Sequence, residues 1–349
     1  MGTIWFCLVA LMIAMYVLLD GFDLGAGAIH LLVAKTDDER RQVLASIGPV
    51  WDGNEVWLLA AGGTLYFAFP ALYASGFSGF YLPLMMVLWL LILRGASIEL
   101  RNHIHSEVWE PLWDFVFCAS SALLAVFFGA ALGNVVRGVP LDASGYFFEP
   151  LWTNFRLGEE TGILDWYTML VGVLALLALV MHGSLWVQMK TSGAVSERAA
   201  KLGARTWWGV LAFTAIVTAI TFQVQPQVLV NLKTWPWGFI FPALAVAGLA
   251  GVAFELVKKN EAKAFLASCA YLAGMLTSVV FGLYPMVMPA RNAMYSMTVA
   301  STKAGNYGLK VGLIWWVIGM ILAAGYFRFV YRSFAGKVST DRKSHGYGH

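Results

Sequence analysis

Charged residues are scarce in this sequence. Asp, Glu, Lys and Arg make up only 12% of the 349 residues, whereas soluble proteins contain about 25%. Hydrophobic residues make up 59%, and the mean hydropathy is +0.70. The 23 basic and 20 acidic residues leave a net charge of +3, which is too small and too scattered to bind a phosphate backbone. The composition predicts an integral membrane protein and excludes nucleic acid as a main partner.

Cysteine is also rare. The three cysteines, Cys7, Cys118 and Cys269, lie far apart, each inside an apolar run. This distribution excludes both a disulfide framework and a thiolate metal site. We expect the three cysteines to be small core residues.

Long hydrophilic segments are missing as well. The largest connections between apolar runs, about 135–163 and 284–308, carry no nucleotide-binding or metal motif. A soluble catalytic domain is therefore not expected. We predict one transmembrane helical bundle over residues 1–335 and a polar, disordered cytoplasmic tail over 336–349.

Long apolar runs dominate what remains. A span needs roughly 20 apolar residues, and continuous runs without strict alternation are typical of helices rather than of a membrane barrel. The sequence therefore predicts an all-α integral membrane protein with about nine transmembrane helices. The expected spans are 3–33, 51–74, 77–98, 113–134, 164–188, 207–225, 236–257, 264–283 and 309–331.

The basic residues are divided unevenly between the two sides of the membrane. The connections after the odd-numbered spans, together with the tail, hold 15 Lys and Arg residues, and the other side holds six. The positive-inside rule then places the N-terminus outside and the C-terminus in the cytoplasm. An odd number of spans requires ends on opposite sides, so the span count and the charge bias agree.

Several ionisable residues lie within the expected spans. A charged side chain costs free energy in the membrane interior, so each of these residues is a candidate for a functional role. With the predicted orientation, all of them fall in the cytoplasmic half of the membrane, although three separate spans supply them. These residues are Asp20, Asp23, Asp52, Glu55, Arg94 and Glu99.

The first span carries two of these carboxylates on nearly one helix face, because Asp20 and Asp23 are three residues apart. Gly21 and Gly25 have the small-xxx-small spacing that lets a neighbouring helix approach closely. One interpretation is a packing seam in which backbone donors or Arg94 satisfy the two carboxylates. The favoured interpretation is a proton or cation pathway, because a packing seam needs no carboxylates.

The balance of charge supports the pathway interpretation. Asp20, Asp23, Asp52 and Glu55 face one obvious buried cation, Arg94, so the four carboxylates cannot all be ionised cheaply. At least one of them is expected to carry a proton.

Histidine is too sparse for a typical haem bundle. Of six histidines, only His30 and His182 fall inside expected spans. One haem between the two is geometrically conceivable. The favoured interpretation is that both are ordinary polar residues, and no metal site is expected.

Four motifs together carry a resemblance that covers essentially the whole chain. They are DGFDLGAG at 20–27, WDGNEVW at 51–57, Arg94 with Gly95 and Arg101, and YPMVMP at 284–289, whose two prolines should also end the eighth span. In this combination the sequence resembles subunit II of the cytochrome bd quinol oxidase family. Glu55 stands where other members carry Gln, and His182 is most similar to the cyanide-insensitive branch.

The resemblance implies a multi-pass subunit in a bacterial or archaeal cell membrane, paired with a subunit I that carries haem b and haem d. The complex would oxidise quinol, reduce dioxygen to water and generate a proton motive force. A small accessory subunit and a structural quinone or lipid are compatible with this resemblance. By the same resemblance, Asp23, Asp52 and Arg94 match residues of a cytoplasmic proton route, and Trp57 matches a residue near an oxygen channel.

Two functions of other classes remain open at this point. Intramembrane carboxylates with Gly and Pro interruptions also mark secondary transporters. In a transporter the interruptions should recur in two halves, whereas here the acidic cluster lies within the first hundred residues. A haem-bearing membrane anchor that uses His30 and His182 is the other alternative.

Overall fold

The computed structural model describes residues 1–158 and 161–338 and is almost entirely helical. The tail predicted over 336–349 lies largely outside these residues. The longer helices are α1 (Gly2–Val33), α3 (Trp51–Ala68), α5 (Tyr81–Leu100), α6 (Trp109–Arg137), α7 (Trp166–Lys190), α8 (Gly193–Val224), α10 (Ile240–Val257), α11 (Glu261–Leu283) and α13 (Asn306–Ser333). Shorter elements are α2 (Asp37–Ile47), α4 (Pro70–Gly79), α9 (Gln227–Thr234), α12 (Val299–Thr302), β1 (Met286–Met288) and β2 (Met297–Thr298).

The all-α membrane fold is confirmed. Among the described residues, eight helices are long and apolar enough to cross a membrane: α1, α5, α6, α7, α8, α10, α11 and α13, with α5 and α10 each extended by a 3-10 turn. The continuous span expected over 51–74 is wrong, because α3 ends at Ala68 and α4 begins at Pro70. Proline has no N–H for the preceding turn and is well suited to the first position of a new helix.

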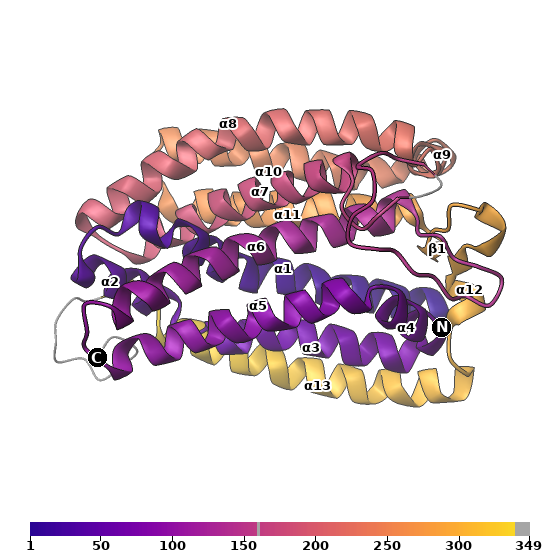
Figure 1. Ribbon diagram of the computed structural model, residues 1–349, viewed down its shortest axis with the longest axis horizontal. Helices are drawn as coiled ribbons and strands as arrows, with labels where there is room; N and C mark the ends of the chain where they lie inside the picture. Colours follow the sequence, from indigo (N-terminus) through magenta and orange to yellow (C-terminus); the bar gives the residue numbers. More distant parts are fainter. Residues whose placement is uncertain (159–160, 339–349) are drawn as a thin grey trace.

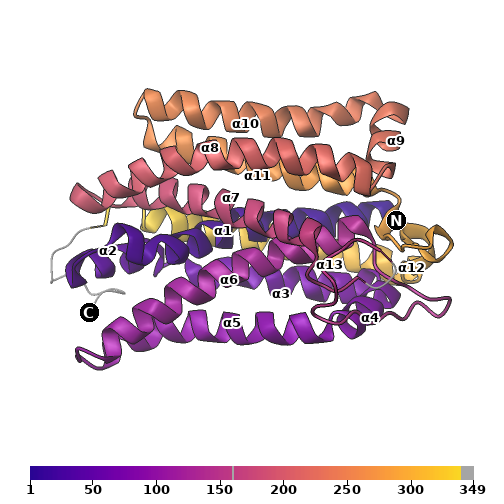
Figure 2. The same cartoon turned by 45° about the horizontal axis from the view of Figure 1, so that its top comes forward.

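The long helices run side by side along one axis, and α1 lies among them (Figure 1). Helix α1 packs against α3, α6 and α7, and α7 also packs against α8. Helices α10 and α11 pair with each other on one side of the bundle (Figure 2). Helix α13 is peripheral: Leu309 is its only buried residue, so this helix presents most of its apolar side chains outward.

Helices α1 and α7 are in very close backbone contact at Gly25 and Gly183. A Cβ on Gly25 would overlap the carbonyl oxygen of Leu179 and would lie 2.8 Å from the Cα of Gly183. Gly21 is less crowded, since its Cβ would lie 3.0 Å from a methyl carbon of Leu179. The face that carries both glycines therefore contacts another helix of the same chain.

The outer end of the bundle is closed by loops. Helix α7 begins with a capping box in which Asp165 accepts hydrogen bonds from the backbone N–H groups of Tyr167 and Thr168, and Arg137 at the end of α6 pairs with the same Asp165. Helix α11 ends at Leu283, directly before the YPMVMP motif, as predicted. Here β1 and β2 form a short antiparallel pair.

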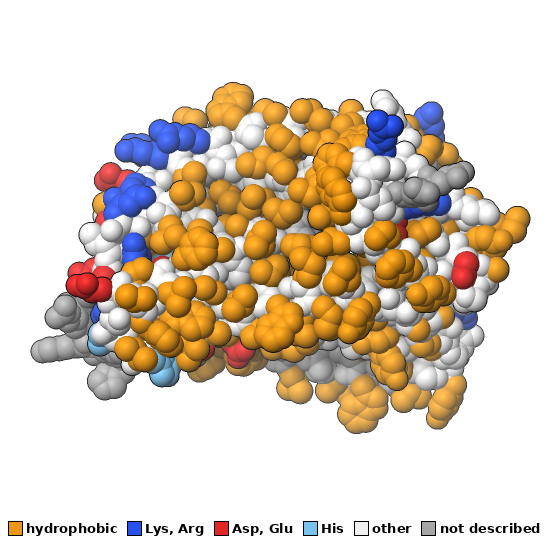
Figure 3. Space-filling view, viewed as in Figure 1, with side chains coloured by type: hydrophobic (Ala, Val, Ile, Leu, Met, Phe, Trp, Pro, Cys, Tyr) orange, Lys and Arg blue, Asp and Glu red, His pale blue; other side chains and the backbone are white. Residues whose placement is uncertain are grey.

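Charged side chains lie mainly at the ends of the molecule, and a broad hydrophobic band covers the face between them (Figure 3). Most Lys and Arg side chains on this face lie at the end where α13 finishes, which is the cytoplasmic end by the positive-inside rule. All three cysteines are free. The expectation that all three are core residues is wrong for Cys7, which is exposed, because the outward face of α1 is apolar as well.

Candidate functional site

A buried ion-pair cluster joins three helices in the cytoplasmic half of the bundle. Arg94 on α5 is fully buried. Its Nη1 lies 2.8 Å from Oδ1 of Asp20 on α1 and donates a hydrogen bond to Oδ2 at 2.9 Å. Its Nη2 donates to Oε2 of Glu55 on α3 at 3.0 Å. One guanidinium therefore bridges two carboxylates, a task that suits its planar set of donors.

The second carboxylate of α1 has different partners. Asp23 is 1% exposed, and its Oδ2 accepts a hydrogen bond from Nδ2 of Asn54 at 2.8 Å. Oδ1 of Asn54 in turn accepts from the hydroxyl of Tyr331 at 2.9 Å. Among the described residues, Asp23 forms no ion pair, and its Oδ1 has no hydrogen-bond partner.

The cluster therefore contains three carboxyl groups and one cation. Arg94 contacts Asp20 and Glu55, which leaves Asp23 with only a neutral donor. An isolated ionised carboxylate in a membrane interior is expensive, whereas a neutral carboxylic acid is tolerated. Asp23 is thus the member best placed to hold a proton.

Asp52 and Glu99 lie outside this set of contacts. Asp52 is exposed in the first turn of α3, three residues before Glu55, and so lies on a similar helix face. The side chain of Glu55 is 23% exposed, so it connects the buried cluster with the surface. Glu99 is exposed at the end of α5 and forms no ion pair among the described residues. Glu99 therefore lies at the expected depth but does not join the buried cluster.

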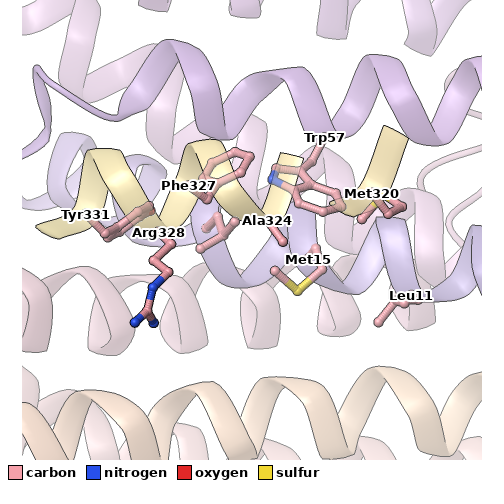
Figure 4. A pocket seen from close by; sticks show the side chains of 9 residues that line it. Leu11, Met15, Trp57, Met320, Ala324, Phe327, Arg328 and Tyr331 are labelled. Atoms are coloured by element: carbon pink, nitrogen blue, oxygen red, sulfur yellow. The ribbon is translucent and has the colours of Figure 1, made fainter. Parts of the chain in front are cut away.

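Trp57 lines an apolar groove on the side of the bundle (Figure 4). The groove has a volume of about 450 Å³ and lies between α1, α3 and the peripheral α13. Trp57 itself is 7% exposed. The lining residues are Leu11, Met15, Leu19, Trp57, Met320, Ala324, Phe327, Arg328 and Tyr331. Such a groove suits a small apolar molecule better than an ion.

His182 is held by hydrogen bonds at both ring nitrogens. Nδ1 lies 2.7 Å from the Ser268 hydroxyl and Nε2 lies 3.0 Å from the carbonyl oxygen of Leu18. The ring also stacks on Phe265 with centroids 4.8 Å apart. A haem ligand must offer a free nitrogen to the iron, so these contacts do not fit the ligand interpretation of His182.

His30 belongs to a second buried cluster, at the cytoplasmic ends of α1 and α6. Its Nε2 lies 2.7 Å from Oδ1 of Asp114. Asp114 also accepts hydrogen bonds from Arg101 at 2.6 Å and from Arg40 at 3.0 Å. Arg101 reaches Asp37 on α2 at 2.6 Å. Sequence reasoning missed this cluster, although the signal was there: Asp114 is a carboxylate inside an expected span.

An ion pair also holds the short helix α2 against α8. Helix α2 begins with a capping box between Thr36 and Glu39, and Glu39 also lies 2.5 Å from a guanidinium nitrogen of Arg198 on α8. The hydrogen bond from Arg198 holds the pKa of Glu39 below its usual value, together with backbone N–H groups that donate to the same carboxylate. Among the described residues, no group of three or more His, Cys, Asp and Glu side chains could hold a metal ion.

Comparison with known proteins gives one consistent result. The cytochrome bd terminal oxidase subunit II family profile matches residues 1–334. The "Probable cytochrome oxidase subunit 2" of Haemophilus influenzae is 33% identical over 97% of this chain and 95% of its own length. The "Cytochrome bd ubiquinol oxidase subunit 2" of Bacillus subtilis is 30% identical over 88% of each chain.

A solved structure supports the fold independently. The bd oxidase structure from Geobacillus thermodenitrificans contains a chain that superposes with a TM-score of 0.72, covering 95% of this chain and 98% of that one. The sequence identity is 17%, so this likeness bears on the fold alone.

Proposed function

Because the chain belongs to the cytochrome bd terminal oxidase subunit II family, we propose that its buried carboxylates carry protons from the cytoplasm into a quinol oxidase complex. The chain is a multi-pass protein of the cell membrane and one subunit of a respiratory oxidoreductase. The family uses haem and quinol. This membership decides against the secondary-transporter alternative.

The haems belong, in this proposal, to a partner subunit I, which would hold haem b, haem d and the quinol-oxidising site. When bound there, the haems would supply electron transfer and the reduction of dioxygen. The support within this chain is His182, whose two ring nitrogens both take part in hydrogen bonds.

One observation carries the proton proposal. Arg94 contacts both Asp20 and Glu55, whereas the neighbouring Asp23 contacts only the neutral amide of Asn54. Asp52 and Glu55 would receive protons from cytoplasmic water, since Asp52 is exposed and Glu55 partly so. Asp23 would hold the proton deeper in the bundle, beside the ion pair of Asp20 with Arg94. Arg94 keeps Asp20 and Glu55 in place and offsets their charge.

Access of dioxygen is a separate role that we assign to the groove beside Trp57. Dioxygen is small and apolar, so it partitions into the membrane interior and into apolar cavities. The groove lies between α1, α3 and α13, and all but one of its lining side chains are uncharged (Figure 4). Trp57 would shape the wall of this path without binding the gas.

The entrance of the proton route can be tested with Asp52→Asn and Glu55→Gln. Each change keeps size and hydrogen bonding but removes a titratable proton. We expect normal haem content, with turnover and proton uptake slowed by roughly tenfold to a hundredfold if uptake limits the rate. The measurement is quinol-driven oxygen consumption and proton uptake by the complete complex in liposomes. Asp38→Asn is the matched control, since Asp38 is exposed on α2.

The entrance assignment fails if both variants keep full turnover and normal proton uptake between about pH 6 and pH 8. An effect of Glu55→Gln alone would place the entrance at the carboxylate that contacts Arg94. An effect of Asp38→Asn equal to the others would mean that surface charge, and not a route, controls the rate.

A further inference from the structure

The side-chain amide of Asn54 connects Asp23 with the peripheral helix α13. We infer that Asn54 and Tyr331 are positioning residues of the proton route, which together hold the carboxyl group of Asp23 in one orientation. Neither residue carries a charge, and neither is among the carboxylates and arginine described above as the route. The inference rests on the proposed role of Asp23.

Asn54 is completely buried, and its side chain is engaged at both ends. Nδ2 donates to Oδ2 of Asp23 at 2.8 Å and lies 3.4 Å from the carbonyl oxygen of Leu19. Oδ1 accepts from the hydroxyl of Tyr331 at 2.9 Å. The amide therefore links α1 to α13 while itself belonging to α3.

Two groups fix which end of the amide faces Asp23. The carbonyl oxygen of Leu19 can only accept, so it favours the orientation in which Nδ2 of Asn54 faces α1, and the hydroxyl of Tyr331 then donates to Oδ1 on the side of α13. The N–H of the amide must then point at Asp23, and Oδ2 of Asp23 becomes an acceptor. Because an amide neither gains nor loses a proton near neutral pH, Asn54 can orient the carboxyl group of Asp23 without taking up its proton.

Tyr331 is itself well anchored. Its ring packs against Phe327 and Trp186, with centroid distances of 6.2 and 6.3 Å. It also lines the apolar groove beside Trp57 (Figure 4). Since most of α13 presents its side chains outward, the bond from Tyr331 to Asn54 is a specific polar link between this helix and the buried carboxyl groups.

The test is a double-mutant cycle on proton uptake by the complete two-subunit complex in liposomes. The four proteins are the unaltered complex, Tyr331→Phe, Asp23→Asn and the double variant. Tyr331→Phe keeps the ring and its packing and removes only the hydroxyl. Tyr326→Phe is the matched control, because Tyr326 is exposed on the same helix and has no hydrogen bond among the described residues.

We expect Tyr331→Phe to slow proton uptake by about two- to tenfold, which corresponds to one hydrogen bond. In the Asp23→Asn background the same change should have no further effect, because the group that it positions is gone. A purely structural role for the hydroxyl would instead slow both backgrounds equally. Asn54→Leu removes both bonds of the amide and should slow uptake more than Tyr331→Phe does.

Three results would overturn the inference. If Asp23→Asn slows uptake and Tyr331→Phe does not, the route stands and the positioning role is wrong. Equal slowing by Tyr331→Phe in both backgrounds would make the hydroxyl independent of Asp23. If Asp23→Asn leaves uptake unchanged, the route through Asp23 fails, and the inference fails with it.

Discussion

Replacing Arg94 by glutamine removes the only cation that contacts Asp20 and Glu55 among the described ion pairs. Both Arg94 and Asp20 are fully buried, whereas Glu55 is 23% exposed. Breaking a buried pair by removing one partner costs about 3–5 kcal/mol. Most of this cost should come from Asp20, because water can reach Glu55. The expected result is a large loss of assembled complex, together with a lower thermal unfolding midpoint.

Two further variants separate the loss of the cation from a general packing defect. Glu55→Gln leaves the Arg94–Asp20 pair intact and should cost at most about 1 kcal/mol, the range of a partly exposed pair. Combining Asp20→Asn with Arg94→Gln removes both buried charges and should restore part of the stability.

The measurement is the yield of complex containing both subunits, with its thermal unfolding midpoint at neutral pH. The reasoning is refuted if Arg94→Gln assembles as well as the unaltered chain. It is also refuted if the double variant is less stable than Arg94→Gln alone, because uncompensated charge would then not be the cause.

Three other predictions follow from the packing and the polar contacts. Gly25→Leu should block assembly, because its side chain would overlap the backbone of α7; an unchanged yield would contradict the observed approach of α1 and α7. His182→Ala should leave the absorption bands of all haems at full occupancy, and loss of one haem equivalent would restore the ligand interpretation. The pair of Glu39 with Arg198 lowers the folded-state pKa of Glu39, so its stabilising effect is present above the unfolded value of 4.5 and is lost as pH falls through the folded pKa. Thermal unfolding of the complex should therefore lose this contribution in acid, and Glu39→Gln should remove that part of the pH dependence; an identical pH dependence in the variant would contradict it.

Depth within the membrane could be predicted from the sequence, because hydropathy indicates which segments lie in the membrane and the positive-inside rule indicates the direction of each span. This reasoning placed Asp20, Glu55 and Arg94 at one depth, and the structure brings them into contact. Depth does not fix the direction in which a side chain points around its helix axis. Glu99, five residues after Arg94, lies near the same end but is exposed.

Neutral polar residues and helix breaks were harder to predict. Asn54 and Tyr331 carry no charge, so nothing in the composition of their apolar spans indicates a functional role. In the structure they connect Asp23 with α13 through hydrogen bonds. The apolar run continues on both sides of Pro70, so the sequence predicted one span over 51–74, although α3 ends at Ala68 and α4 begins at Pro70. The partnership of His30 with Asp114 depends on how α1 and α6 pack, which a single sequence does not contain.

The most direct test of the proton route is Asp23→Asn in the complete complex, reconstituted in liposomes with a pH-sensitive dye on the side from which protons are taken up. Asparagine keeps the size of the side chain and can still bond to Asn54, so assembly and haem content should be normal. We expect proton uptake and quinol-driven oxygen consumption to slow together, by roughly tenfold to a hundredfold. Proton uptake at the unaltered rate in a fully assembled complex would contradict the role of this buried carboxyl group.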